Sequence, residues 1–314
     1  MNNLPAIAVK SLSKTFGEFQ AVRDVSFQVA AGEIFSLLGP NGAGKTTIMR
    51  MLACLSRPDG GDAWVMGHSI RSDPMGVKSA IGIVPQDIAL YADLSAYENL
   101  SFWGKMYGLR GRILGQRIQE VLEITGLADR QKGPVGKFSG GMKRRLNLGI
   151  ALLHRPQVII MDEPTVGIDP QSRRGILDGI RELNRQGMTV LYTTHYMEEA
   201  QEISDHIAVM DLGQIIACGT HAELVRIVGE MSRVDLVLNT DAWRVVDAWQ
   251  HIEGVSRVFP EDGKLSLLVE DSDLVLPRLF EAASRSGVRI TAAEIKEPNL
   301  EAVFLHLTGK ALRN

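Results

Sequence analysis

The sequence predicts an α/β protein whose mostly parallel sheet is preceded by an antiparallel β subdomain, interrupted by a helical subdomain and followed by a small α+β domain. Three observations support this fold class. A glycine-rich loop separates a short apolar strand from a helix, amphipathic helices occupy the middle of the chain, and strands alternate with helices after them. The 314 residues are enough for two domains, since one domain usually takes about 100–200 residues.

The first part of the chain reads as β structure. Residues 6–9 and 22–29 alternate on either side of a turn at Gly17, and residues 33–38 form a short apolar strand. Apolar side chains then recur at helical spacing over residues 45–55. The predicted order is antiparallel strands, a buried strand, a glycine loop and a helix.

A helical subdomain is expected over about residues 88–155. Its first helix opens with a capping box formed by Ser95 and Glu98, and amphipathic runs cover residues 112–125 and 142–153.

The alternation of strands and helices resumes beyond this subdomain. Strands are expected at 158–161 and 189–193, helices at 170–184 and from Tyr196, and a hairpin around 211–213. This pattern is typical of a mostly parallel sheet covered by helices.

We expect the first domain to span residues 1–230 and the second residues 231–314. The second has the βαββαβ order of a ferredoxin-like fold, with elements at 234–238, 242–250, 255–259, 265–269, 275–286 and 289–294. A short helix starting at Pro298 follows. Its apolar face is expected to pack against the sheet and consists of Leu300, Val303, Phe304 and Leu307.

Composition excludes several classes of protein. The 34 Lys and Arg residues against 37 Asp and Glu residues leave no basic excess for nucleic acid. Cys54 and Cys218 suggest neither a disulfide framework nor a zinc site. The first residues do not fit a signal peptide, so none is expected, and no apolar run approaches the roughly 18–20 residues of a membrane span. We therefore expect a cytoplasmic chain whose membrane role depends on a partner.

Residues 39–46 satisfy G-x-x-x-x-G-K-[ST], the P-loop pattern, between the expected strand and helix. Backbone N–H groups of such a loop converge on phosphate oxygens, the lysine reaches the β- and γ-phosphates, and the following hydroxyl binds Mg²⁺. The sequence thus predicts a site for ATP and Mg²⁺ formed by Gly39, Pro40, Asn41, Gly42, Ala43, Gly44, Lys45, Thr46 and Thr47.

Two carboxylates, Asp162 and Glu163, end the buried strand at 158–161, where ligands of parallel sheets bind. Successive side chains of a strand point to opposite faces. We expect Asp162 to bind Mg²⁺ and Glu163 to hold the attacking water as catalytic base.

A second phosphate-binding helix end is predicted at Ser139, Gly140 and Gly141, which open the helix near residue 142. An ordinary P-loop kinase does not use a second one. Following a helical insertion, this run resembles the signature of ATP-binding cassette (ABC) proteins, and the resemblance covers roughly residues 5–225. The basic run at 143–145 on the same helix is expected to be a solvated face.

Further motifs of the ABC family occur in order at Phe16, Gln86, Asp169 and His195. The resemblance implies that Phe16 stacks on adenine, Gln86 contacts Mg²⁺ or the water and relays nucleotide state, Asp169 lies in the D-loop, and His195 contacts the γ-phosphate. Taken singly, Phe16 fits a core residue, Gln86 a surface amide and His195 a satisfied polar group. Their order and spacing favour the functional interpretation.

The family also implies a head-to-tail homodimer with two ATP molecules between the subunits. Each ATP would contact the P-loop of one subunit and the region of Ser139 and Gly141 of the other. The sequence departs from the common family pattern at Met142, usually glutamine, and at Phe138, usually leucine. Methionine cannot hydrogen-bond a ribose, so weaker nucleotide or dimer contacts are expected.

The runs at 139–142, 165–170, 194–199 and 297–305 resemble a branch of drug, antibiotic and lipid exporters. The expected function is ATP hydrolysis that energises a separate integral membrane permease, with the chain bound peripherally to the inner face of the cell membrane. A soluble ABC ATPase acting on DNA or ribosomes is the alternative. A P-loop kinase and an importer subunit fit less well.

Overall fold

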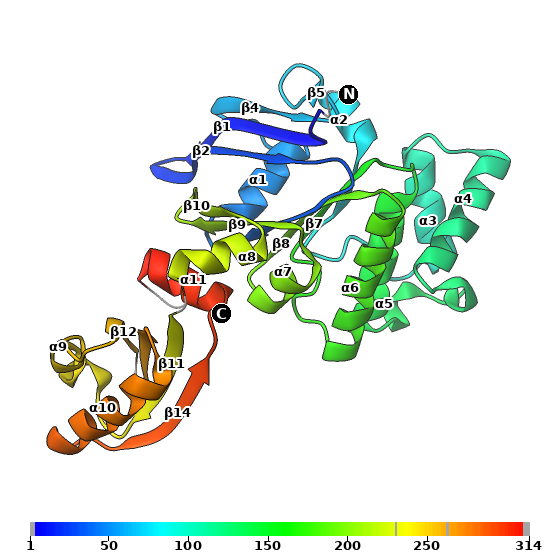
Figure 1. Ribbon diagram of the computed structural model, residues 1–314. Coiled ribbons are helices and arrows are strands. Elements are labelled where there is room, and N and C mark those ends of the chain that lie inside the picture. The colour runs from blue at the N-terminus through cyan, green and yellow to red at the C-terminus, as the bar shows by residue number, and fades with distance from the viewer. Residues whose placement is uncertain (1–3, 230, 262–263, 310–314) are drawn as a thin grey trace. The chain divides into compact units, whose positions relative to one another are not determined.

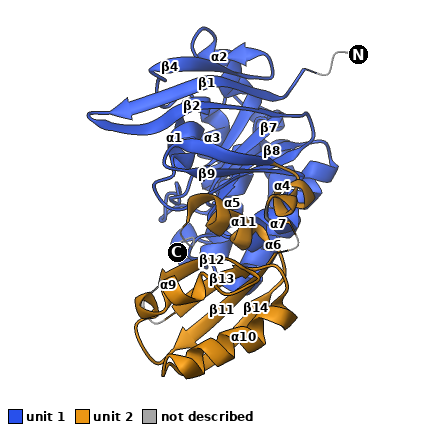
Figure 2. Ribbon diagram, turned by 60° about the vertical axis from the view of Figure 1, so that its left-hand side comes forward, with its two compact units in different colours: residues 1–218 blue, residues 219–314 orange. Residues whose placement is uncertain are grey.

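The computed structural model describes residues 4–229, 231–261 and 264–309. The chain forms two compact units, residues 1–218 and 219–314 (Figure 2). The division precedes the expected boundary after residue 230 because α8 (His221–Val225) and η3 (Arg226–Val228) pack against α11 (Leu300–Thr308) within the second unit.

The first unit begins with an antiparallel sheet in the order β2-β1-β4-β5. The expected hairpin is β1 (Ile7–Phe16) and β2 (Phe19–Val29), which is longer than its apolar segments suggested. The sequence did not predict β4 (Gly60–Val65) or β5 (His68–Ser69), because β4 starts within the glycines that end the preceding helix. The helix α2 (Pro74–Ala80) follows.

The core of this unit is a six-stranded sheet in the order β10-β9-β3-β8-β7-β6. Its β3–β9, β3–β8, β7–β8 and β6–β7 pairs are parallel. All residues of β3, β7 and β8 are buried, as expected for a parallel sheet with both faces covered. The strands are β3 (Ile34–Leu38), β6 (Ile81–Val84), β7 (Val158–Asp162), β8 (Thr189–Thr194), β9 (His206–Asp211) and β10 (Gln214–Gly219).

Apart from α2, the described helices of this unit are of two kinds, and Figure 1 labels them. Those that follow core strands are α1 (Lys45–Leu52), α6 (Pro170–Arg185) and α7 (Met197–Ile203). The helical subdomain contains α3 (Ala96–Met106), α4 (Gly111–Ile124), η1 (Ala128–Arg130), η2 (Val135–Lys137) and α5 (Gly140–Leu152). The predicted capping box of Ser95 and Glu98 starts α3. Helix α1 ends before the predicted Leu55, since Cys54 has a φ of 54°.

The second unit contains an antiparallel sheet in the order β12-β13-β11-β14. The helix expected over 242–250 is two short pieces, η4 (Ala242–Arg244) and α9 (Val246–Trp249). The remaining elements are β11 (Ser232–Leu238), β12 (Val255–Glu261), β13 (Lys264–Val269), α10 (Ser272–Arg285) and β14 (Ile290–Lys296).

The terminal helix α11 differs in detail from its prediction. It begins at Leu300 with Asn299 as its cap, not at Pro298. Its contact with the sheet is made by Ala302, Val303 and Leu305, which cluster with Phe259 and Leu268. Leu307, which was expected on the packed face, is 37% exposed.

Among the helices formed by residues 4–229, 231–261 and 264–309, none combines the length and apolar composition needed to cross a bilayer.

Candidate active site

The P-loop lies between β3 and α1 and borders a pocket of about 430 Å³. Two of its glycines have left-handed backbones, Gly42 with φ +83° and Gly44 with φ +100°. A Cβ on Gly44 would also lie 2.5 Å from the carbonyl oxygen of Ala21, so this position admits only glycine. The pocket is lined by Phe19, Ala21, Asn41, Gly42, Ala43, Gly44, Lys45, Thr46, Thr47, Gln86, Glu163, Val166 and His195.

Lys45, 4% exposed, extends back along the P-loop. Its Nζ donates hydrogen bonds to the carbonyl oxygens of Gly39 (2.7 Å) and Pro40 (3.0 Å), and lies 3.2 Å from Oε1 of Glu163. Burial lowers the pKa of the ammonium, whereas the adjacent Glu163 carboxylate opposes the shift. The lysine is therefore a buried donor that a phosphate anion in the pocket can attract.

Three of the predicted catalytic side chains lie next to Glu163. Besides Lys45, it accepts a hydrogen bond from Nε2 of Gln86 (3.3 Å), and its Oε1 lies 3.4 Å from Nδ1 of His195. Its φ of +44° is left-handed, a conformation that costs a non-glycine residue on the order of 1–3 kcal/mol. A hydrogen bond from the Glu163 N–H to Oγ1 of Thr193 (3.0 Å) holds the backbone there. Such strain is typical of functional sites.

Oxygen atoms of Asp162, Thr46 and Thr193 meet next to the P-loop. Oδ1 of Asp162 accepts hydrogen bonds from Oγ1 of Thr46 (3.2 Å) and Oγ1 of Thr193 (2.7 Å). Mg²⁺ prefers oxygen ligands and is commonly held by one or two protein groups together with substrate phosphates. Carboxylate and hydroxyl oxygens at this position fit that preference.

The sequence did not predict a buried polar cluster around Glu199, four residues after His195. Oε2 of Glu199 accepts hydrogen bonds from the hydroxyls of Thr165 (2.9 Å), Tyr192 (2.7 Å) and Thr194 (2.9 Å). Burial and then the charge of Glu199 raise the pKa of Tyr192 well above its ordinary value. Glu199 thereby links the segment that follows Glu163 to the end of β8. The available signal was the run of hydroxyl-bearing residues that ends β8, in which Tyr192 and Thr194 stand two positions apart and therefore on the same face.

Ser139, Gly140 and Gly141 begin α5, as predicted, but are not among the residues that line the P-loop pocket. The Ser139 side chain caps the helix by accepting from the Met142 N–H (3.2 Å). Asp169 likewise caps α6 by accepting from the Ser172 N–H (2.9 Å), which holds the pKa of its carboxyl below the usual range.

The aromatic residue at the pocket is Phe19 rather than Phe16. The two residues pair across the β1–β2 hairpin and both are exposed, Phe16 by 53% and Phe19 by 60%, so only the lining of the pocket distinguishes them. The Nζ of Lys14 lies 5.3 Å from the centre of the Phe16 ring. Because sequence spacing cannot tell which of two paired side chains faces a pocket, it did not single out Phe19.

Arg144 corrects the expectation of a solvated basic face at 143–145. It is 5% exposed, and its guanidinium points to the Gln86 segment rather than to solvent. The helix that carries it packs against β6, and Arg144 is among the buried residues of that helix.

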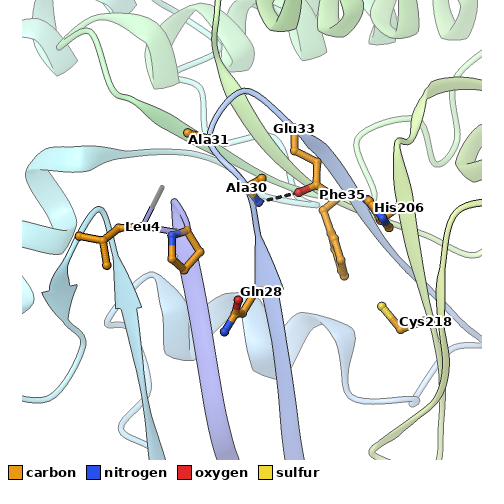
Figure 3. Close-up of a pocket in the computed structure, with 9 residues that line it drawn as sticks. Leu4, Gln28, Ala30, Ala31, Glu33, Phe35, His206 and Cys218 are labelled. Carbon is orange, nitrogen blue, oxygen red and sulfur yellow. Dashed lines mark hydrogen bonds and ion pairs between the residues drawn. The ribbon is translucent and has the colours of Figure 1, made fainter. Parts of the chain in front are cut away.

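A smaller pocket of about 260 Å³ elsewhere in the first unit has a different character (Figure 3). Glu33 accepts from the Ala30 N–H (2.5 Å) and pairs with Nδ1 of His206 (2.7 Å), while Phe35 and Cys218 border the space. Lys and Arg are absent from the described residues that line it. It therefore lacks the cationic side chains that favour a polyphosphate.

Comparisons with known proteins identify a family and several relatives of this chain. The pattern of the family described as ABC transporter matches residues 22–166. The linearmycin resistance ATP-binding protein LnrL of Bacillus subtilis is 43% identical over 98% of this chain and 100% of its own length. The daunorubicin resistance ATP-binding protein DrrA3 of Streptomyces coeruleorubidus is 38% identical over 97% and 96%. The Nod factor export ATP-binding protein I of Rhizobium etli is 35% identical over 98% and 95%.

Solved structures confirm the predicted fold class. An ATP-binding subunit of an ABC transporter matches 71% of this chain and 93% of its own, with a TM-score of 0.64 and 29% identity. A dimeric ATP-binding cassette in a post-hydrolysis state, bound to ADP and Pi, matches 68% and 98%, with a TM-score of 0.61 and 25% identity. This chain therefore belongs to the ATP-binding proteins of ABC transporters, and it is an ATPase of that family.

Proposed function

We propose that this chain binds and hydrolyses ATP to energise a separate membrane permease that exports drug, antibiotic or lipid-like compounds. The observation that carries the catalytic part is the convergence of Lys45, Gln86 and His195 on Glu163 beside the P-loop. The names of its relatives, which concern resistance to linearmycin and daunorubicin and export of Nod factor, support export and the substrate class.

In this proposal the P-loop N–H groups and Lys45 bind the triphosphate. A phosphate group carries more charge than a carboxylate, so Lys45 exchanges part of its contact with Glu163 for phosphate oxygens. Glu163, released from the lysine, can then accept a proton from the attacking water. His195 contacts the γ-phosphate, and Gln86 orients the water or contacts the metal ion.

The metal ion in this proposal is Mg²⁺. Thr46 and Asp162 would hold it, because their oxygens lie together next to the P-loop. Gln86, whose side chain contacts Glu163, would be the third ligand. When bound, Mg²⁺ neutralises charge on the phosphates.

The partners are a second copy of this chain and a permease. The helix end at Ser139, Gly140 and Gly141 is suited to phosphate but lies apart from the P-loop pocket, so an ATP molecule of a head-to-tail homodimer would use it from the partner's side. The dimeric relative supports this assembly.

Permease docking is assigned to residues 87–107 in the helical subdomain. Tyr91, Tyr97 and Phe102 are each 39–47% exposed there, and Tyr91 and Phe102 pack edge to face with ring centres 5.0 Å apart. Exposed aromatic side chains of this kind are enriched at protein interfaces. Binding there would place the chain on the inner face of the cell membrane.

The test is an affinity purification of the Glu163→Gln variant from detergent-solubilised membranes with ATP and Mg²⁺ present. Loss of the base should trap the ATP-bound dimer and retain its partner. Recovery of an integral membrane protein supports the transporter function, and reconstitution with that protein then identifies the exported compounds. Recovery of ribosomes or DNA alone would instead support the soluble ATPase alternative.

A further inference from the structure

The helix that begins with the second phosphate-binding end is joined directly to the Gln86 segment. Nη1 of Arg144 donates hydrogen bonds to the carbonyl oxygens of Pro85 (2.8 Å) and Gln86 (2.6 Å). One turn further along α5, Nδ2 of Asn147 donates to the carbonyl oxygen of Asp87 (3.4 Å). Three consecutive backbone carbonyls of this loop are thus held by one face of α5.

Burial makes these contacts costly to break. Arg144 is 5% and Asn147 3% exposed, and within the described residues Nε of Arg144 has no hydrogen-bond partner. Burial lowers the pKa of Arg144, and the charge of Asp87 opposes the shift. A buried guanidinium with a donor already unpaired depends on its remaining acceptors. The Gln86 backbone is consequently fixed relative to α5 for as long as Arg144 keeps both carbonyls.

The neighbouring Arg145 makes a different connection. Its Nη1 donates to the carbonyl oxygen of Thr125 (3.1 Å), just beyond the end of α4. Successive residues of an α-helix are about 100° apart around its axis, because a turn takes 3.6 residues. Helix α5 therefore holds the Gln86 loop with one arginine and the rest of the helical subdomain with the other.

We propose that Arg144, supported by Asn147, is a positioning residue that couples the catalytic Gln86 to the helix of Ser139. The side chain of Gln86 contacts Glu163, so a shift of its backbone displaces one of the groups around the catalytic carboxylate. The same shift, transmitted through Arg144, moves α5 and its phosphate-binding end. This inference rests on the proposed ATPase function and names the side chain that links its two nucleotide-contacting parts.

The experiment compares Arg144→Met with Arg145→Met in the full chain by hydrogen exchange and ATPase kinetics. Methionine keeps an apolar stem but removes the donors. For Arg144→Met we expect faster exchange confined to residues 84–90 and a kcat about tenfold lower, with the Kd for ATP changed less than about twofold. Arg145→Met should instead speed exchange at residues 121–127 and leave kcat near that of the unmodified chain.

A second, milder variant tests the same loop with less disturbance of the fold. Asn147→Ala removes only the contact with Asp87 and should raise exchange at residues 84–90 by a smaller amount. Unchanged exchange there in Arg144→Met, or equal loss of protection throughout the unit, would overturn the positioning role. An unmodified chain without ATPase activity would instead refute the proposed function itself, so the two failures are distinguishable.

Discussion

Both units of this protein contain a charged cluster around a buried side chain, but they pair the charges differently. In the second unit, Nε of Arg233 lies 2.6 Å from Oδ1 of Asp235, and its Nη1 lies 2.8 Å from Oε1 of Glu301. In the first unit, Glu163 is 3.2 Å from Lys45 and 3.4 Å from His195, and all three border a pocket.

This difference separates structural charges from functional ones. The guanidinium of Arg233 lies close to two carboxylates and 3.2 Å from Oγ of Ser266, so its charge is paired within the unit, although among the described residues its Nη1 makes an ion pair and no hydrogen bond. The groups around Glu163 are held at longer distances, and in the proposed mechanism they exchange partners when a phosphate arrives. Short, closed pairing stabilises a fold, whereas long pairing at a pocket leaves charge available for chemistry.

The largest expected effect tests the cluster of Lys45, Glu163 and His195, which is called the open cluster because it borders the pocket. Glu163→Gln should lower kcat for ATP hydrolysis by about 10²–10⁴-fold, since an amide cannot accept the proton from water. ATP binding should persist because the P-loop and Lys45 are unchanged. Phosphate-release assays give kcat, and equilibrium binding of a fluorescent ATP analogue gives affinity. Normal turnover would remove Glu163 from the mechanism.

A substitution in the closed cluster, which consists of Arg233, Asp235 and Glu301, should change the stability of the second unit and not the rate of catalysis. Arg233→Met removes the nearest cation from the partly exposed Asp235 and Glu301 and, within the described residues, leaves them only Lys296, at 3.3 and 3.6 Å. It should lower the free energy of unfolding of the second unit by about 1–3 kcal/mol. Hydrogen exchange of β11 and β13 in the full chain measures this loss.

Arg278→Met is the matched control. Arg278 pairs with Glu253 (3.0 Å) on the surface of the same unit, where such a pair contributes at most about 1 kcal/mol. Equal exchange in the two arginine variants would contradict the structural importance of the buried cluster.

A smaller effect decides which aromatic side chain belongs to the open site. Phe19 borders the pocket, whereas the family resemblance assigns adenine stacking to Phe16. Phe19→Ala should raise the Kd for ATP about tenfold, in line with the loss of one base-stacking contact. Phe16→Ala should have the lesser effect, and a reversed order would support the assignment to Phe16. Calorimetric titration with ATP distinguishes them.

The smallest effect concerns acid stability of the closed cluster. Burial raises the pKa of Asp235, but hydrogen bonds from Ser266 and Arg233 outweigh it and hold the pKa below its ordinary value. The ionised carboxylate therefore stabilises the fold above the unfolded pKa of about 3.9, and this contribution is lost as pH falls through the folded pKa. Thermal unfolding between about pH 5 and pH 3 should show a smaller decline in Tm for Asp235→Asn than for the unmodified chain.

Much of the site could be predicted because its signals are local. The P-loop needs contiguous residues at set spacings, and the caps at Ser95 and Ser139 depend on hydrogen bonds to residues three positions away. Alternation and helical spacing likewise indicated most core strands and helices. Such short-range rules depend only on residues that are close in the chain. The sequence by itself therefore determined the family and the kind of fold.

Only the tertiary structure decided which distant side chains meet. Gln86 and Glu163 are 77 positions apart, and Arg144 is 58 positions from the Gln86 carbonyl that it holds. The burial of Arg144, the place of Phe19 and the hydroxyls around Glu199 all depend on how the strands and helices of the first unit pack. A sequence pattern specifies the face on which a side chain stands, but the element packed against that face determines whether it meets solvent, a carboxylate or a loop carbonyl.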